Sequence, residues 1–294
     1  MRIVLAKTAG FCMGVRRAVD MAVSLVARET GPVFTYGPLI HNPQVLKRLE
    51  SQGLRVMSRV PEKGRGTVLI RAHGVAPQER DALVRAGFTV RDATCPRVAS
   101  VQEILSRLSR EGRPAVILGD PDHPEVLGLV GHAPERTWVI REPSEVAAIP
   151  VLPRLGVVSQ TTQDQGLYGE IARAVEKRFP DARIFSTICG ATEKRQKEAM
   201  DLARRVDAVV VVGGRESANT RRLYEVAQKA GTLSFHVEDP RELDVAFLTS
   251  LDTVGVTAGA STPRWIIREV CRSLSVPARP ESAPVAAMPL EALG

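Results

Sequence analysis

The chain is poor in aromatic residues and has no long apolar run. Phe, Trp and Tyr make up 4% of its 294 residues, which leaves little surface for stacking the bases of single-stranded nucleic acid. No stretch approaches the ~18 consecutive apolar residues expected of a membrane-spanning helix. The residues after Met1 form neither the basic nor the apolar part of a secretory signal. We therefore expect a cytoplasmic protein that binds neither membrane nor nucleic acid.

Cysteine is also scarce, with four residues and no close pair. Structural zinc sites usually contain C-x2-4-C pairs, so a zinc knuckle is not favoured. A reducing compartment argues against a disulfide framework. No G-x-G-x-x-G follows an apolar run, and residues 213–215 (GGR) are a poor substitute, which argues against a dinucleotide cofactor.

The remaining composition is that of a soluble globular protein, with 44% hydrophobic and 25% charged residues. The formal net charge is +7. A positive surface attracts anionic substrates and acidic partner proteins. The net charge by itself says nothing about the fold. Most arginines fall on stretches where solvent exposure is the ordinary interpretation.

Three cysteines share one sequence setting: each follows a short apolar run and precedes a helical pattern. Cys12 precedes a stripe of valines at helical spacing, Cys95 is followed by Pro96, and Cys189 precedes a charged helical stretch at 193–206. Unpaired N–H groups and the dipole at a helix start favour the thiolate. A single free cysteine is more often a small buried apolar residue, and we expect this of Cys271. Three in one setting favour a shared ligand.

The pattern between the cysteines predicts an α/β fold. Further apolar runs occur at residues 32–36, 67–70, 115–118, 155–158, 208–212 and 253–256, and a polar loop follows each of them. Near-continuous apolar strands are typical of parallel sheets covered on both faces, whose ligands bind at the carboxyl ends of the strands. We expect three βα lobes with mostly parallel sheets around a central cluster and substrate cavity. The expected boundaries are 13–94 for lobe 1, 95–188 for lobe 2, 1–12 with 189–276 for lobe 3, and 277–294 for a loose tail.

Three thiolates from separate parts of a chain suit an iron–sulfur cluster better than zinc, because a cuboidal cluster accepts ligands from several directions. With three cysteines, a 4Fe-4S cube has one iron without a protein thiolate. The alternative is a non-catalytic protein that holds a structural metal and binds anions. Colour separates the two, because a cluster protein is brown when purified without oxygen and a zinc protein is colourless.

Eight short motifs then occur in order along residues 1–275: GFCMGV, LIHNPQV, RAHGV, DATCP, DHPEV, SQTT, SAN and TAGAST. In this the chain resembles the 4-hydroxy-3-methylbut-2-enyl diphosphate reductase family, the last enzyme of the methylerythritol phosphate route to isoprenoids. The resemblance implies a 4Fe-4S cluster on Cys12, Cys95 and Cys189. It also implies reductive removal of a hydroxyl from an allylic diphosphate, which yields isopentenyl and dimethylallyl diphosphate, with ferredoxin or flavodoxin as the electron donor.

The same resemblance implies two further groups of residues. Diphosphate ligands would be His41, His73, Ser217, Asn219 and Ser261. Proton delivery near the substrate hydroxyl would involve His123, Glu125 and Thr161. Taken alone, a loop histidine is usually a structural hydrogen-bonding group, and Ser or Asn before a helix is usually an N-cap. A carboxylate near a helix start usually stabilises the dipole.

One position departs from the family pattern. Many members have two serines before the asparagine, whereas this chain has Ala218 between Ser217 and Asn219. A hydrogen bond to a charged group contributes about 1.5–3 kcal/mol. We therefore expect weaker diphosphate binding from this change, without loss of the site.

Overall fold

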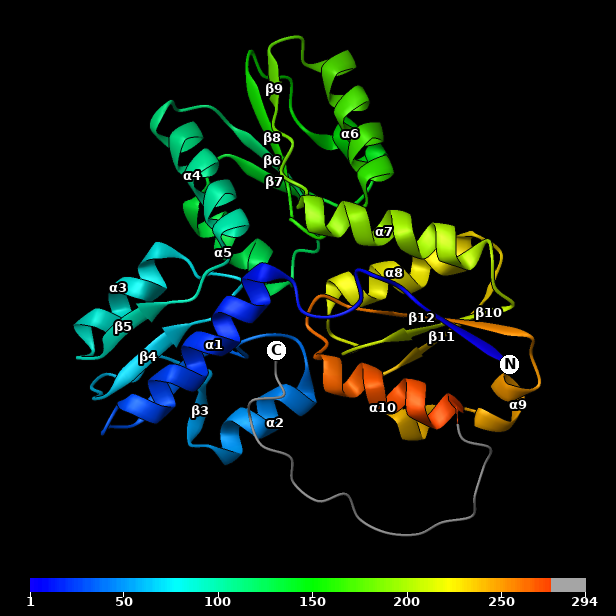
Figure 1. Cartoon of the computed structure of the whole chain (residues 1–294). Helices are drawn as coiled ribbons and strands as arrows, with labels where there is room; N and C mark the ends of the chain where they lie inside the picture. Colours follow the sequence, from blue (N-terminus) through cyan, green and yellow to red (C-terminus); the bar gives the residue numbers. More distant parts are fainter. Residues whose placement is uncertain (276–294) are drawn as a thin grey trace. The chain divides into compact units, whose positions relative to one another are not determined.

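The computed structural model describes residues 1–275 and contains three four-stranded sheets, all of whose strands are parallel (Figure 1). Sheet A has the order β1 (Arg2–Leu5), β12 (Thr253–Ala258), β10 (Ala208–Val212), β11 (Leu233–Val237). Sheet B has the order β3 (Leu54–Met57), β2 (Val33–Tyr36), β4 (Thr67–Ile70), β5 (Thr89–Asp92). Sheet C has the order β7 (Thr137–Ile140), β6 (Ala115–Leu118), β8 (Leu155–Ser159), β9 (Ala182–Ile184).

Helices connect the strands. In chain order they are α1 (Met13–Arg28), α2 (Pro43–Ser51), α3 (Pro77–Arg85), α4 (Pro96–Arg110), α5 (Pro124–His132), α6 (Gln165–Arg178), α7 (Gly190–Ala203), α8 (Ala218–Lys229), α9 (Val245–Thr249) and α10 (Arg264–Ser275). Two short 3-10 helices are η1 (Pro143–Ala148) and η2 (Pro240–Glu242). None of the helices within residues 1–275 combines the length and apolar character needed to cross a bilayer.

The three sheets repeat one topology. In each sheet the two central strands are followed by the polar loops singled out above, and one edge strand (β1, β5 or β9) leads to a cysteine. Sheet A is completed by the N-terminal strand β1, whose Ile3 is paired with Val254 of β12. The predicted architecture of three parallel α/β lobes is confirmed.

The central strands are buried on both faces, as near-continuous apolar sequence predicts. Along β10, Val210 and Val212 face one apolar cluster together with Ile266 of α10, whereas Val209 and Val211 face a second cluster with Leu223 of α8. Figure 1 shows α10 on one side of this sheet and α7 and α8 on the other. Successive side chains of a strand point to opposite faces, so one valine run fills two cores.

The described residues form two compact units. One contains residues 1–16, 41–45 and 190–275, with sheet A; the other contains residues 17–40 and 46–189, with sheets B and C. The boundaries of the three lobes stay a prediction. The expected tail at 277–294 lies outside the described residues.

Three strands and one helix boundary differ from the sequence-based expectation. The strands β3, β7 and β11 have no long apolar run, because each is an edge strand with partly exposed side chains; Leu233 at the start of β11 is 46% exposed. The helix α7 begins at Gly190, directly after Cys189, rather than at Glu193. Each of the three cysteines therefore immediately precedes a helix, as predicted.

Candidate functional site

Glu125 is a buried carboxylate in the first turn of α5, with 2% of its surface exposed. Its Oε1 accepts a hydrogen bond from the backbone N–H of Thr161 at 2.6 Å, and its Oε2 accepts one from the Thr161 hydroxyl at 3.0 Å. Burial raises the pKa of Glu125 to about 7, although the two hydrogen bonds from Thr161 oppose the shift. A carboxyl group with this pKa is protonated in about half of the molecules at neutral pH, which suits a general acid.

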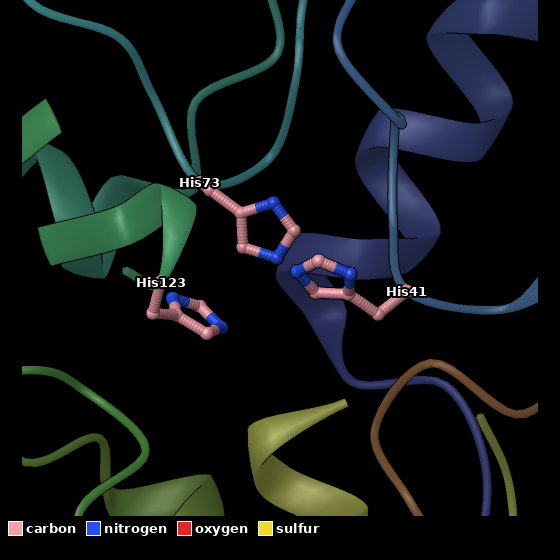
Figure 2. Close-up of side chains that lie close together, drawn as sticks. All are labelled: His41, His73 and His123. Atoms are coloured by element: carbon pink, nitrogen blue, oxygen red, sulfur yellow. The ribbon is translucent and has the colours of Figure 1, made fainter. Parts of the chain in front are cut away.

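His123 is the N-cap of α5, and its Nδ1 accepts a hydrogen bond from the backbone N–H of Glu125 at 3.1 Å. An accepting Nδ1 leaves the ring proton on Nε2. The ring of His73, from the loop after β4, meets that of His123 edge to face, with 5.4 Å between centroids and an 88° angle between planes. Figure 2 shows the His73 ring leaving a loop and the His123 ring leaving the start of a helix. The structure thus brings together His73, His123 and Glu125 from the loops of two sheets.

Gln160 joins the two loops of sheet C, a function that the sequence interpretation missed. Its side chain is fully buried, and its Oε1 accepts hydrogen bonds from the backbone N–H of Asp120 at 3.1 Å and from Gln163 Nε2 at 3.3 Å. Its Nε2 donates to the hydroxyl of Thr162 at 3.2 Å. Its only signal in the sequence is an amide residue directly after a buried strand. By holding the loops after β6 and β8 together, Gln160 supports the contact between Glu125 and Thr161.

Two of the cysteines lie in the same unit, next to these loops. The backbone N–H of Cys189 donates to the carbonyl of Thr161 at 2.9 Å. The backbone N–H of Cys95 donates to the carbonyl of Ala72 at 2.9 Å, one residue before His73, and Cys95 is the N-cap of α4. Both cysteines are therefore anchored through the main chain to the loops that contain the predicted site residues.

Cys12 lies in the other unit, at the start of α1. Its backbone N–H donates to the carbonyl of Ala260 at 3.2 Å, and its Sγ accepts a hydrogen bond from the N–H of Val15 at 3.5 Å. The sulfur atom thus caps the first turn of the helix.

The loops after β10 and β12 bring Ser217, Ser261 and the main chain of His41 together in the first unit. Ser261 donates to the carbonyl of His41 at 3.0 Å, and its Oγ lies 3.3 Å from Ser217 Oγ. Ser217 is the N-cap of α8 and accepts from the N–H of Thr220 at 3.3 Å, so the local interpretation of this serine is correct. Gly214 permits the close approach, because a Cβ there would lie 2.6 Å from the His41 carbonyl oxygen.

Asn219, the second residue of α8, is buried, with 4% of its surface exposed. Its Oδ1 accepts a hydrogen bond from the N–H of Ala260 at 2.9 Å, while its Nδ2 finds no hydrogen-bond partner among residues 1–275. A buried donor without an acceptor costs about 1–3 kcal/mol. A bound anion at the start of α8 would remove this cost, since helix N-termini attract anions.

The cysteine donor set fits an iron–sulfur cluster. Cys12, Cys95 and Cys189 are free thiols of intermediate burial, and each lies at a helix start. Cys271 differs, because it packs against the apolar core of sheet A and burial raises its pKa. The prediction of a core residue therefore holds in part, because Cys271 packs against this core but is only partly buried. Three thiols at helix starts and one thiol packed against an apolar core are the pattern expected of three ligands and one packing residue.

Comparisons with known proteins agree over most of the chain. The family model described as "LytB protein" matches residues 3–275. A curated relative from Geobacter sulfurreducens, named 4-hydroxy-3-methylbut-2-enyl diphosphate reductase, is 47% identical over 270 residues, which cover 92% of this chain and 95% of the relative. A relative of the same name from Pelobacter propionicus is 44% identical over 270 residues, covering 92% of this chain and 96% of the relative.

Two solved structures are similar as well. The E-1-hydroxy-2-methyl-but-2-enyl-4-diphosphate reductase from Plasmodium falciparum has a TM-score of 0.89 at 25% identity, with 99% of this chain and 96% of that chain covered. A structure described as (E)-4-hydroxy-3-methyl-but-2-enyl diphosphate reductase, the terminal enzyme of the non-mevalonate pathway, has a TM-score of 0.69 at 36% identity. The match covers 94% of this chain and 99% of the chain in that structure.

Proposed function

The chain belongs to the LytB protein family, and on this basis we propose that it reductively removes the hydroxyl group of 4-hydroxy-3-methylbut-2-enyl diphosphate. The family resemblance seen in the short motifs is thereby confirmed. In the proposed reaction the C–O bond breaks and two electrons and two protons are consumed. One proton leaves with the hydroxyl as water and the other joins an allylic carbon, which gives isopentenyl or dimethylallyl diphosphate.

We propose Cys12, Cys95 and Cys189 as the protein ligands of a 4Fe-4S cluster. The support is the chemistry of the donor set: three free thiols at helix starts, on loops whose backbones are hydrogen-bonded to site loops. When bound, such a cluster supplies electrons one at a time and has one iron without a cysteine ligand. With a net charge of +7 the protein would attract an acidic one-electron carrier such as ferredoxin or flavodoxin.

The diphosphate group would be bound by His41 and His73 together with the loop that starts α8. Asn219 supports this assignment, because its buried Nδ2 is a donor without an acceptor. Ser217 and Ser261 add hydroxyl groups at the same helix start. Ala218 is the first residue of α8 and has no hydroxyl to offer there. A phosphate oxygen facing Ala218 would be left with backbone N–H groups as donors.

Proton delivery would fall to Glu125, and its burial is the single observation on which the proposed chemistry depends most. A carboxyl group with a pKa of about 7 is a proton donor at neutral pH. The Thr161 hydroxyl lies 3.0 Å from Glu125 Oε2, and in the proposal it passes the proton of the protonated carboxyl group on to the substrate hydroxyl. His123 accepts from the Glu125 N–H and so orients the first turn of α5.

The test is to purify the protein without oxygen, measure iron and acid-labile sulfide, and assay it with the allylic diphosphate and a chemical reductant. We expect brown protein with stoichiometric iron and sulfide, and formation of the two five-carbon diphosphates. Colourless protein that contains zinc and is inactive with substrate would instead favour the non-catalytic metal- and anion-binding protein.

A further inference from the structure

The loop that leads to Cys12 is bound by two side chains of α7. The Glu198 carboxylate accepts hydrogen bonds from the backbone N–H groups of Lys7 and Thr8, each at 2.8 Å, and from the Thr8 hydroxyl. Arg195 donates through its guanidinium to the carbonyl of Gly10 at 2.8 Å. Three positions shortly before Cys12 are thus hydrogen-bonded to one helix.

This loop needs such partners because it leaves the edge of a sheet. Among residues 1–275 the strand β1 pairs only with β12, and its last ladder bond runs from the N–H of Ala6 to the carbonyl of Val256. After that the chain turns, with Gly10 at a φ of 113°. Backbone groups in a turn of this kind have no sheet partner. The Gly10 carbonyl is buried, and a buried group without a partner is costly. Glu198 supplies the acceptors and Arg195 supplies the donor.

Both Glu198 and Arg195 are suited to holding the loop at all times. Burial by itself would raise the pKa of Glu198, but the hydrogen bonds from Thr8 and Lys7 lower it below its usual value, so the carboxylate stays charged. Arg195 is 6% exposed, and a buried guanidinium is held in place by the groups it contacts. The two residues are three apart on α7, so they project from one face of the helix.

We propose that Arg195 and Glu198 form an anchor pair that positions Cys12. The proposal rests on the proposed function in one respect, namely that Cys12 is a cluster ligand. The anchor pair holds residues 7–10 in one conformation and thereby sets the direction from which the Cys12 thiol approaches the proposed cluster. Because α7 begins directly after Cys189, one helix both follows one proposed ligand and holds the loop of another.

The loop of Cys95 has an anchor of its own, which supplies a reciprocal control. The guanidinium of Arg17 donates to the carbonyl of Thr94 at 3.1 Å and to that of Asp92 at 3.3 Å. This loop also leaves an edge strand, β5. Arg17 is exposed, so that its replacement removes the contacts without leaving a cavity.

The first experiment measures the alkylation of each cysteine by iodoacetamide in the full-length, cluster-free protein, resolved by mass spectrometry. Loss of charge-assisted hydrogen bonds should let the loop open more often, and Glu198→Ala should therefore alkylate at Cys12 about tenfold faster than wild type. Rates at Cys95, Cys189 and Cys271 should not change. Glu198→Gln, which keeps one acceptor oxygen, should fall between. Asp201→Ala removes an exposed carboxylate from the same helix and should match wild type.

The reciprocal variant, Arg17→Gln, should accelerate alkylation at Cys95 and leave Cys12 unchanged. The second experiment uses cluster-loaded protein and follows iron release to a chelator, which should be faster for Glu198→Ala than for wild type or Asp201→Ala. If wild type binds no cluster, the proposed function fails, while the alkylation rates still report on the anchor pair. An unchanged Cys12 rate in Glu198→Ala would overturn the proposal. So would equal acceleration at all four cysteines, since that indicates a general loss of stability.

Discussion

Replacing Glu125 with glutamine tests the proposed proton donor most directly. The variant should fold, because the amide can keep both contacts with Thr161: its oxygen can accept from the backbone N–H, and its NH2 can donate to the hydroxyl oxygen. The amide cannot release a carboxylic proton. Turnover should therefore fall by about 10²–10⁴-fold, the usual contribution of a positioned general acid, with substrate affinity largely retained.

The assay is single-turnover cleavage of the C–O bond with pre-reduced protein, which removes electron supply as a variable. Wild-type rate should fall as pH rises above about 7, because the carboxyl group loses its proton there. The residual rate of Glu125→Gln should lack this pH step. Glu135→Gln, the same change at an exposed glutamate after α5, should behave as wild type. Cleavage by Glu125→Gln at close to the wild-type rate would refute the assignment.

The same pKa predicts an effect on stability. In the folded protein the pKa of Glu125 is about 7, above its ordinary value of 4.5, so the folded state holds the proton more tightly than the unfolded state. Stability from this group is fully present below pH 4.5 and is lost as pH rises through about 7, at a cost of about 3 kcal/mol. In denaturant unfolding of cluster-free protein, the free energy of unfolding of Glu125→Gln should therefore rise relative to that of wild type between pH 5 and pH 8.5. A constant difference across this range would contradict the raised pKa.

Three further predictions concern the ligands. Replacing any one of the three proposed cluster cysteines by serine should remove most of the iron and the activity, whereas Cys271→Ser should keep both; iron analysis decides. His41→Ala and His73→Ala should mainly raise KM, and the wild-type KM should rise with salt because the diphosphate site is electrostatic; a loss of kcat at unchanged KM would move these histidines to catalysis. Ala218→Ser adds a hydroxyl at the first residue of α8 and should lower KM by up to about tenfold, measured by steady-state kinetics; a higher KM would indicate that the position cannot reach the diphosphate.

The local sequence was sufficient to predict the elements next to the cysteines and the buried strands. Hydrophobic periodicity reports which residues are buried, and β10 and β8 are buried at every position. Each of the three cysteines lies between an apolar run and a helical stripe, and in the structure a helix begins directly after each of them. The edge strands β1, β5 and β9 were predicted because each precedes a cysteine and a helical pattern. The edge strands β3, β7 and β11 have partly exposed side chains and no such marker, so they escaped detection.

The amino-acid sequence by itself determined the strand–helix alternation, the three helix-start thiols and, through its short motifs, the family. Only the tertiary structure decided which side chains meet. The contact of Thr161 with Glu125 spans 36 residues, and that of Glu198 with Lys7 spans 191. The first contact depends on strand order, because the paired strands β6 and β8 are parallel and bring their carboxyl ends to one edge. The second depends on the packing of α7 beside the loop after β1. The pKa of Glu125 is likewise a tertiary property, since burial by distant residues raises it.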